Sequence, residues 1–210
     1  MRVVVLRGAG TRFCVGGDLR EFDGRDDLPT HLARVTGPLH QALADLARMP
    51  APVVCRVQGA AAGAGFSLAV AADLCVAARS ARFVIAYTAL GLTPDGSGSW
   101  YLPRLVGLAR ALDLALTNRP LSADEAVAMG LIARVVDDDA LDAEVDAVVA
   151  ALRAGSTHAL GATKRLLRDS SGRDLEAQLA AERDALSAAA AVDGAEGIAA
   201  FVAKRPPEFR

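Results

Sequence analysis

The sequence predicts an α/β fold with parallel strands, followed by a helical region toward the C-terminus. Short apolar runs rich in β-branched residues alternate with helical segments through the first two thirds of the chain. Apolar residues then recur at helical spacing in an alanine-rich stretch between residues 138 and 204. Because such alternation is typical of parallel sheets, we expect an α/β core over residues 1–140 and helices over residues 141–210.

Five short apolar runs are predicted to form strands. They are bounded by glycine, proline or polar residues, which end a strand or begin a turn. The predicted strands are residues 3–6, Val53–Val57, Leu74–Ala78, residues 83–86 and residues 131–136.

Helices are predicted where apolar residues recur every three or four positions. Ser122 and Glu125 form a capping-box pattern, and Gly37-Pro38 can break or kink the longest helix. Residues 59–65, which are all glycine or alanine, are expected to form a small, flexible loop. The predicted helices are residues 30–49, 66–72, 100–105, 108–116 and 122–129, with three or four more between residues 138 and 204.

The predicted C-terminal helices carry more leucines than water exposure favours. These side chains are expected to pack on the α/β core or on another subunit. They are Leu160, Leu166, Leu167, Leu175, Leu179 and Leu186.

Composition excludes several classes of function. The net charge of −2 provides no basic surplus for nucleic acid and no basic helix for an anionic membrane surface. No apolar run reaches about 18 residues, and no signal-peptide pattern is present, so a cytoplasmic protein is expected. Cys14, Cys55 and Cys75 are predicted to be reduced thiols. The three histidines lack the spacing of metal ligands, and no metal site is predicted.

Glycine-rich loops follow the predicted strands, and several functions can use such loops. Gly8-Ala9-Gly10 lacks the third glycine of a dinucleotide-binding loop. Residues 65–69 partly resemble the nucleophile elbow of a serine hydrolase, with Ser67 as the nucleophile, although the second glycine is absent. A further interpretation joins the glycines at 16–17 and 63–65: backbone N–H groups from both loops form an oxyanion hole.

Several segments in a fixed order resemble the enoyl-CoA hydratase/isomerase (crotonase) superfamily. Together they extend over nearly the whole chain, and the ordered set is more specific than any single segment. The segments are Val3 to Gly10, Phe13 to Leu19, Pro52 to Leu74, Ala81 to Phe83, Gly91 to Gly96, Leu102 to Gly107 and Ala126 to Leu131.

The resemblance implies a fold of repeated ββα turns, with C-terminal helices that support a homotrimer or hexamer. It implies that the backbone N–H groups of Gly17 and Ala64 hold the thioester oxygen of an acyl-CoA as an enolate. No cofactor beyond the CoA moiety of the substrate is implied. The residues expected to bind the substrate are Gly16, Asp18, Leu19, Gly63, Gly65, Ser67 and Tyr87.

One carboxylate remains for the chemistry. Hydratases of this family use two glutamates, and matching the motifs puts Ser67 and Tyr87 in those positions. Addition of water requires a group that activates water and a group that delivers a proton, and hydroxyls do both poorly. Asp95 lies in a turn where several family isomerases carry an acid, in a context most similar to the isomerases of aerobic phenylacetate catabolism. We therefore expect a double-bond isomerase with Asp95 as both base and acid.

Three alternatives within the family stay open. Asp95 can instead be a nucleophile on an aryl-CoA, as in family dehalogenases. A hydratase-type lyase is a second possibility, and a catalytically inactive protein that binds CoA or other subunits is the third. The third follows from the N-terminus, because the family normally carries a strand hairpin before residues 3–6. Met1 falls where that strand already runs, so we expect an incomplete CoA groove or a true start that lies upstream.

Overall fold

The computed structural model describes residues 1–209, which form two compact units. The first, called the core unit here, contains Val5–Ala47 and Val54–Val145. The second, called the helical unit, contains Met1–Val4, Arg48–Val53 and the chain from Asp146 onward. Every residue that the sequence assigns to the site belongs to the core unit.

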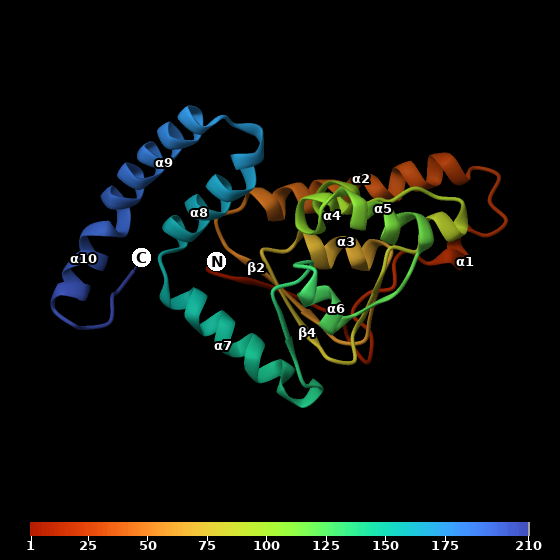
Figure 1. Cartoon of the computed structure of the whole chain (residues 1–210), viewed down its shortest axis with the longest axis horizontal. Coiled ribbons are helices and arrows are strands. Elements are labelled where there is room, and N and C mark those ends of the chain that lie inside the picture. Colours follow the sequence, from red (N-terminus) through yellow and green to blue (C-terminus); the bar gives the residue numbers. More distant parts are fainter. Residues whose placement is uncertain (210) are drawn as a thin grey trace. The chain divides into compact units, whose positions relative to one another are not determined.

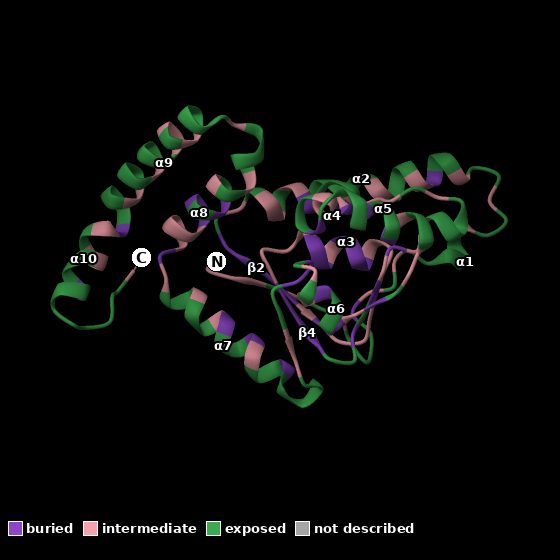
Figure 2. Cartoon of the chain, viewed as in Figure 1, coloured by how far each residue is buried: buried purple, intermediate pink, exposed green. Residues whose placement is uncertain are grey.

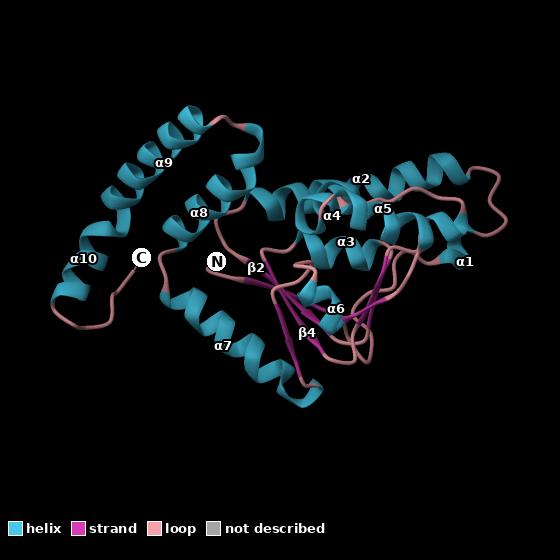
Figure 3. Ribbon diagram, viewed as in Figure 1, coloured by secondary structure: helices cyan, strands magenta, loops and turns pink. Residues whose placement is uncertain are grey.

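Two small sheets form the centre of the core unit (Figure 3). The larger sheet has the order β1 (Val4–Arg7), β2 (Val53–Val57), β4 (Leu74–Ala78), β7 (Arg134–Val136), and the smaller sheet has the order β3 (Ala60–Ala62), β5 (Arg82–Val84), β6 (Leu121–Ser122). In the larger sheet, β4 pairs in parallel with both β2 and β7. In the smaller sheet, β5 pairs in parallel with β3 and antiparallel with β6.

From β2 to β5, successive strands alternate between the two sheets. The chain passes from β2 in the larger sheet to β3 in the smaller one and then into helix α3 (Ala64–Ala71). It repeats this step from β4 to β5 before helices α4 (Gly98–Val106) and α5 (Leu108–Thr117). This order confirms the α/β class and the repeated strand–strand–helix pattern expected from the sequence.

The strands and helices of the core unit differ in how deeply they are buried. Strand β2 is buried along most of its length, as is typical of a strand inside a parallel sheet. Helix α3 is apolar on all sides, and Figure 2 shows it largely buried, as expected for a helix inside a core. By contrast, α2 (Leu28–Arg48) buries only His31 and Leu43. It continues through Pro38, so the proline does not divide the predicted helix.

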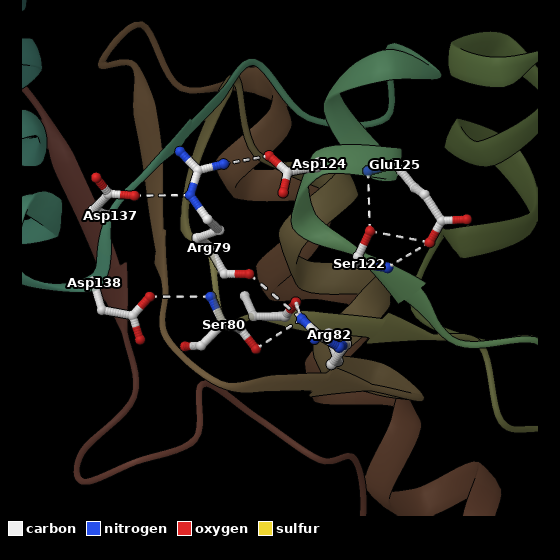
Figure 4. A network of polar contacts seen from close by, with 9 residues as sticks. Arg79, Ser80, Arg82, Ser122, Asp124, Glu125, Asp137 and Asp138 are labelled. Carbon is white, nitrogen blue, oxygen red and sulfur yellow. Dashed lines mark hydrogen bonds and ion pairs between the residues drawn. The ribbon is translucent and has the colours of Figure 1, made fainter.

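A network of charged and polar groups joins the ends of three core-unit elements (Figure 4). Arg79, directly after β4, contacts Asp124 at 2.6 Å in the first turn of α6 (Ala123–Ala128). The same guanidinium contacts Asp137 at 2.8 Å, directly after β7. The amide of Ser80 donates to Asp138 at 3.0 Å. Because these side chains are half exposed, the network aligns strand ends and adds little stability.

The helical unit contains most of the C-terminal helices. These helices are α7 (Leu141–Ala154), which begins in the core unit, α8 (Thr157–Asp169), α9 (Leu175–Ala189) and α10 (Ala195–Val202) (Figure 1). Arg2 donates to the backbone carbonyl of Arg153 at 2.9 Å, which attaches the N-terminus to the end of α7. Ser156 donates a buried hydrogen bond of 2.6 Å to Asp193, which lies in a π-helical segment.

Four of the six C-terminal leucines are not buried within the chain, so for them the other expectation, packing on another subunit, stays a prediction. Leu167, Leu175, Leu179 and Leu186 are between 54% and 74% exposed, and α9 and α10 are mostly exposed in Figure 2. The continuous helical stretch Leu175–Val202 is also long and apolar enough to pass a simple test for a membrane span. The sequence argument missed this because it counted unbroken apolar runs. Asp193, buried against Ser156 within this stretch, argues for packing in the protein instead.

Two short strands were not predicted. Strand β3 lies in the segment expected to be a flexible loop, because its three alanines carry no strand signal of their own. It forms through its partners, β5 on one side and Cys14 on the other, where Ala62 donates to the Cys14 carbonyl at 2.9 Å. Strand β6 has only two residues, which is below what periodicity can detect.

The three cysteines are free. Cys55 and Cys75 are buried neighbours in register on β2 and β4. Burial raises the pKa of Cys55 to about 12, and burial together with the charge of Cys55 raises that of Cys75 well above its ordinary value. These two thiols therefore stay protonated and act as small apolar side chains.

We expect Gly65→Ala to destabilise the protein strongly. A Cβ atom at Gly65 would lie 2.0 Å from the carbonyl oxygen of Cys14, and backbone on both sides must shift to admit it. Such overpacking costs about 1–3 kcal/mol. Gly172→Ala is the control, because nothing lies within 4 Å of its added Cβ, and a change within about 0.5 kcal/mol is expected. Urea unfolding measures both, and equal midpoints would contradict the close packing.

Candidate active site

The first component of the site is the turn from β3 into α3. Gly63 makes this turn with φ of 53° and ψ of −121°, and its N–H donates to the Val84 carbonyl at 3.1 Å. No side chain caps the helix. Within residues 1–209, the N–H of Ala64 has no hydrogen-bond acceptor. It is a free donor at the positive end of a helix.

The second component is the loop at Gly16 and Gly17, which lies against the first. A Cβ atom built on Gly16, whose φ is +99°, would lie 3.6 Å from the amide nitrogen of Ala64. One built on Gly63 would lie 3.7 Å from the Cα of Gly16. In the described part of the chain, the N–H of Gly17 also has no acceptor. Two adjoining loops thus each contribute a backbone donor without a protein partner.

The remaining residues of the first loop have structural contacts of their own. Asp18 is the N-cap of α1 (Leu19–Phe22) and accepts from the N–H of Arg20 at 3.0 Å. A Cβ atom at Gly17 would lie 2.9 Å from the ring of Phe22, so this glycine lets the ring pack on the loop. Leu19 is half exposed. By capping α1, the Asp18 side chain connects the glycine loop to the start of that helix.

The third component is the turn that carries Asp95. Gly96 and Ser97 follow it with φ of 62° and 71°, which bends the chain sharply into α4. The Asp95 side chain is 28% exposed, and its Oδ1 lies 2.6 Å from Nε2 of His40 on α2. The carboxylate is therefore accessible and already engaged on one oxygen.

Ser67 and Tyr87 both bind the backbone of Asp95. The buried hydroxyl of Ser67 donates to the Asp95 carbonyl at 2.6 Å, and the Tyr87 hydroxyl donates to it at 3.4 Å. Burial, partly opposed by a hydrogen bond with Ser67, raises the pKa of the Tyr87 phenol. Both hydroxyls are therefore neutral groups that hold the Asp95 turn. Because the Ser67 hydroxyl is committed to that carbonyl, the serine-hydrolase interpretation loses its nucleophile.

An almost wholly apolar cavity adjoins this cluster. Its volume is about 140 Å³, and Ser67, Tyr87 and Pro94 line the side next to Asp95. The rest of the lining comes from α3, the segment after β5, α4 and α5: Phe66, Ile85, Gly98, Ser99, Leu102, Pro103, Leu108, Ala111, Leu112 and Ala115. Of the aromatic residues near these motifs, Trp100 lies elsewhere, stacked under Arg104 at 3.9 Å.

The structure brings together residues from four separate segments of the sequence. Gly16, Gly17, Gly63 and Ala64 adjoin, and Ser67 and Tyr87 meet the Asp95 turn. Sequence reasoning missed His40, which was considered only as a metal ligand. No spacing signal links it to Asp95, because 55 residues separate them. Among the described residues, no group of three potential ligands is placed to hold a metal ion.

Comparisons with known proteins agree on one family. Residues 1–210 match the family described as enoyl-CoA hydratase/isomerase. The chain is 41% identical to the 1,2-epoxyphenylacetyl-CoA isomerase of Escherichia coli, over all of this chain and 81% of that protein. It is 34% identical to a 4-chlorobenzoyl coenzyme A dehalogenase of Arthrobacter, over 82% of this chain and 63% of the other.

A solved structure gives the same result. The enoyl-CoA hydratase from Polaromonas sp. JS666 superposes with a TM-score of 0.95 at 39% identity, over all of this chain and 82% of the other. These three similar proteins thus carry three different activities in their names: an isomerase, a dehalogenase and a hydratase.

We expect Ser67→Ala to loosen the Asp95 turn. The substitution removes a buried hydrogen bond of 2.6 Å, which contributes about 1 kcal/mol to stability. Tyr87→Phe should cost less, because its hydrogen bond is longer at 3.4 Å and only partly buried. Urea unfolding compares both with Ser187→Ala, an exposed helix position where a change within about 0.5 kcal/mol is expected. A Tyr87→Phe loss larger than that of Ser67→Ala would reverse this order.

Proposed function

This chain belongs to the enoyl-CoA hydratase/isomerase family, whose members act on acyl-CoA substrates, and we propose that it is an acyl-CoA double-bond isomerase. In the proposed reaction, Asp95 removes a proton from the carbon next to the thioester carbonyl of a 3-enoyl-CoA. The electrons move onto the carbonyl oxygen and form an enolate. Asp95 then returns the proton two carbons further along, which leaves the double bond between carbons 2 and 3.

The two free N–H groups support the enolate step. We propose that the thioester oxygen accepts hydrogen bonds from Gly17 and Ala64, which have no other acceptor in residues 1–209. Each such donor stabilises the transition state by on the order of 3 kcal/mol. The partial positive charge at the start of α3 adds to this effect as negative charge develops on the oxygen.

The bonding of Ser67 and Tyr87 is the observation that carries isomerisation over hydration. The family motifs put these residues where hydratases have glutamates, and both hydroxyls are engaged with the Asp95 carbonyl. Hydration needs one group for the water and another for the proton. In the cluster of Ser67, Tyr87 and Asp95, the carboxylate is that of Asp95. One carboxylate is enough for isomerisation, because the same group removes the proton from one carbon and returns it to another.

The apolar cavity supports a hydrophobic acyl group. Its lining is mostly aliphatic and includes the rings of Phe66 and Tyr87, which favours an unsaturated aliphatic or a ring-containing acyl chain. We propose that the CoA moiety lies along residues 16–19 and that Gly63 admits the thioester, while Gly65 acts through its packing against Cys14. The name of the Escherichia coli relative adds ring-oxygenated acyl-CoA as a candidate substrate. We propose that no cofactor or metal takes part.

We propose that the working form is a homotrimer or hexamer in the cytoplasm. The exposed leucines of α9 support this assembly, because they form an apolar surface that a second copy can cover. The net charge of −2 gives no reason to expect nucleic acid or an anionic membrane as a partner.

A second candidate function is hydrolytic dehalogenation of an aryl-CoA, and the His40–Asp95 contact favours it. Here an Asp95 oxygen attacks the ring carbon that bears the halogen, and halide leaves to give an aryl ester of Asp95. Water then cleaves the ester, restoring the carboxylate and releasing the hydroxylated ring. This water must lose a proton, and His40 is the imidazole adjacent to Asp95.

We expect Asp95→Asn to lower kcat for a 3-enoyl-CoA by roughly 10²- to 10⁴-fold, because the amide cannot accept the substrate proton. The product is followed by its absorbance as a conjugated thioester. Affinity for CoA and the unfolding midpoint should stay close to those of the wild type. Asp45→Asn, an exposed change on α2, is the matched control and should keep full activity. Undiminished turnover by Asp95→Asn removes the proposed role.

Mass spectrometry separates the two candidates. An isomerase incubated with its substrate should leave the mass of the Asp95 peptide unchanged, because no bond to the protein forms. In D2O the product should take up deuterium whenever the proton on Asp95 exchanges with solvent. If the protein is a dehalogenase, a reaction with 4-chlorobenzoyl-CoA that is quenched during turnover should contain an aryl ester on Asp95. Detection of that ester would replace the isomerase proposal with the second candidate.

A further inference from the structure

The carboxylate of Asp95 has a single side-chain partner in the described part of the chain. Nε2 of His40 lies 2.6 Å from Oδ1, and no other side chain of residues 1–209 forms a hydrogen bond or ion pair with either oxygen. His40 belongs to α2, and Asp95 belongs to the turn before α4, so the contact joins two elements far apart in the sequence. When the Asp95 carboxylate is ionised it only accepts hydrogen bonds, and Nε2 is then the donor in this contact.

The backbone and the side chain of Asp95 are held by different groups. Ser67, Tyr87 and the N–H of Gly98 hold its carbonyl oxygen, at 2.6, 3.4 and 3.4 Å. These contacts fix the turn and leave rotation about the side-chain bonds of Asp95 free. His40 restrains that rotation, because its imidazole is bonded to one particular oxygen.

The geometry points to His40 as the positioning residue for Asp95. We propose that its Nε2–H holds Oδ1 and leaves Oδ2 to remove and return the substrate proton. This inference rests on the proposed function, in which one carboxylate must face two carbons of the acyl chain in turn. A carboxylate free to rotate would often face neither carbon, and a displacement of about 1 Å can cost on the order of 100-fold in rate.

A pair of substitutions tests whether a hydrogen-bond donor is what His40 provides. His40→Leu removes the donor and should lower kcat by about 10- to 100-fold while KM for the acyl-CoA changes less than about twofold. His40→Gln places an amide N–H near the position of Nε2 and should restore kcat to within about threefold of the wild type. Gln41→Leu is the matched control on α2, because its side chain bonds Asp45, away from the site, and it should keep full activity.

Two results would overturn the inference. If His40→Leu keeps its kcat, Asp95 needs no restraint. If His40→Gln is as slow as His40→Leu, the imidazole acts as a proton acceptor or carrier, and the positioning role is wrong.

An NMR measurement separates this inference from the proposed function. With ¹⁵N-labelled histidine, the Nε2–H of His40 should give a downfield proton signal that is lost in His40→Gln and shifted or lost in Asp95→Ala. The signal requires no turnover. A wild type that fails to isomerise 3-enoyl-CoA but shows the signal overturns the function and keeps the contact. A wild type that isomerises, loses activity in Asp95→Asn and lacks the signal overturns the His40 inference alone.

Discussion

The close approach of Gly65 to the backbone of Cys14 is the constraint on which the site depends. A Cβ atom at Gly65 would lie 2.0 Å from the Cys14 carbonyl oxygen, and the same carbonyl accepts from Ala62 at 2.9 Å. Helix α3 can therefore begin directly beside the first glycine loop. This packing places the loop at Gly16 and Gly17 against the start of α3, where the N–H of Ala64 has no acceptor among residues 1–209. The proposed oxyanion site is thus made by backbone and by the absence of side chains.

The Asp95 turn is built on a different principle. Two hydroxyls from α3 and from the segment after β5 bind its carbonyl oxygen, and an imidazole from α2 binds its carboxylate. By the family motifs, Ser67 and Tyr87 stand where hydratases carry glutamates, and under the proposed function this exchange of acid for hydroxyl has two linked consequences. It removes the groups that would activate water, and it supplies neutral donors that fix the remaining carboxylate. A buried carboxylate at position 67 would instead repel Asp95.

The sequence predicted features that depend on local signals and missed features that depend on distant partners. The capping box at Ser122 and the strands β2 and β4 were predicted with correct bounds, because each is encoded in a few adjacent residues. Strand β3 was missed because three alanines have no strand preference until Cys14 and β5 pair with them. The glycines and Asp95 were proposed as site residues through ordered family motifs, since Pro-Asp-Gly alone is also a common turn. His40 was missed as a site residue because only the fold brings α2 next to Asp95.

The openness of the Asp95 carboxylate limits how the proposed reaction can work. Its side chain is 28% exposed and that of His40 is 52% exposed, so water reaches both before substrate binds. Hydrogen bonds to an enolate are strong only where water is excluded. The protein provides part of this exclusion through the apolar cavity beside Tyr87 and Pro94. The acyl chain must provide the rest by covering Asp95 when it binds. We therefore expect a longer or bulkier acyl group to raise kcat as well as affinity, because the bound acyl chain excludes water from the two N–H groups and from the carboxylate at the same time.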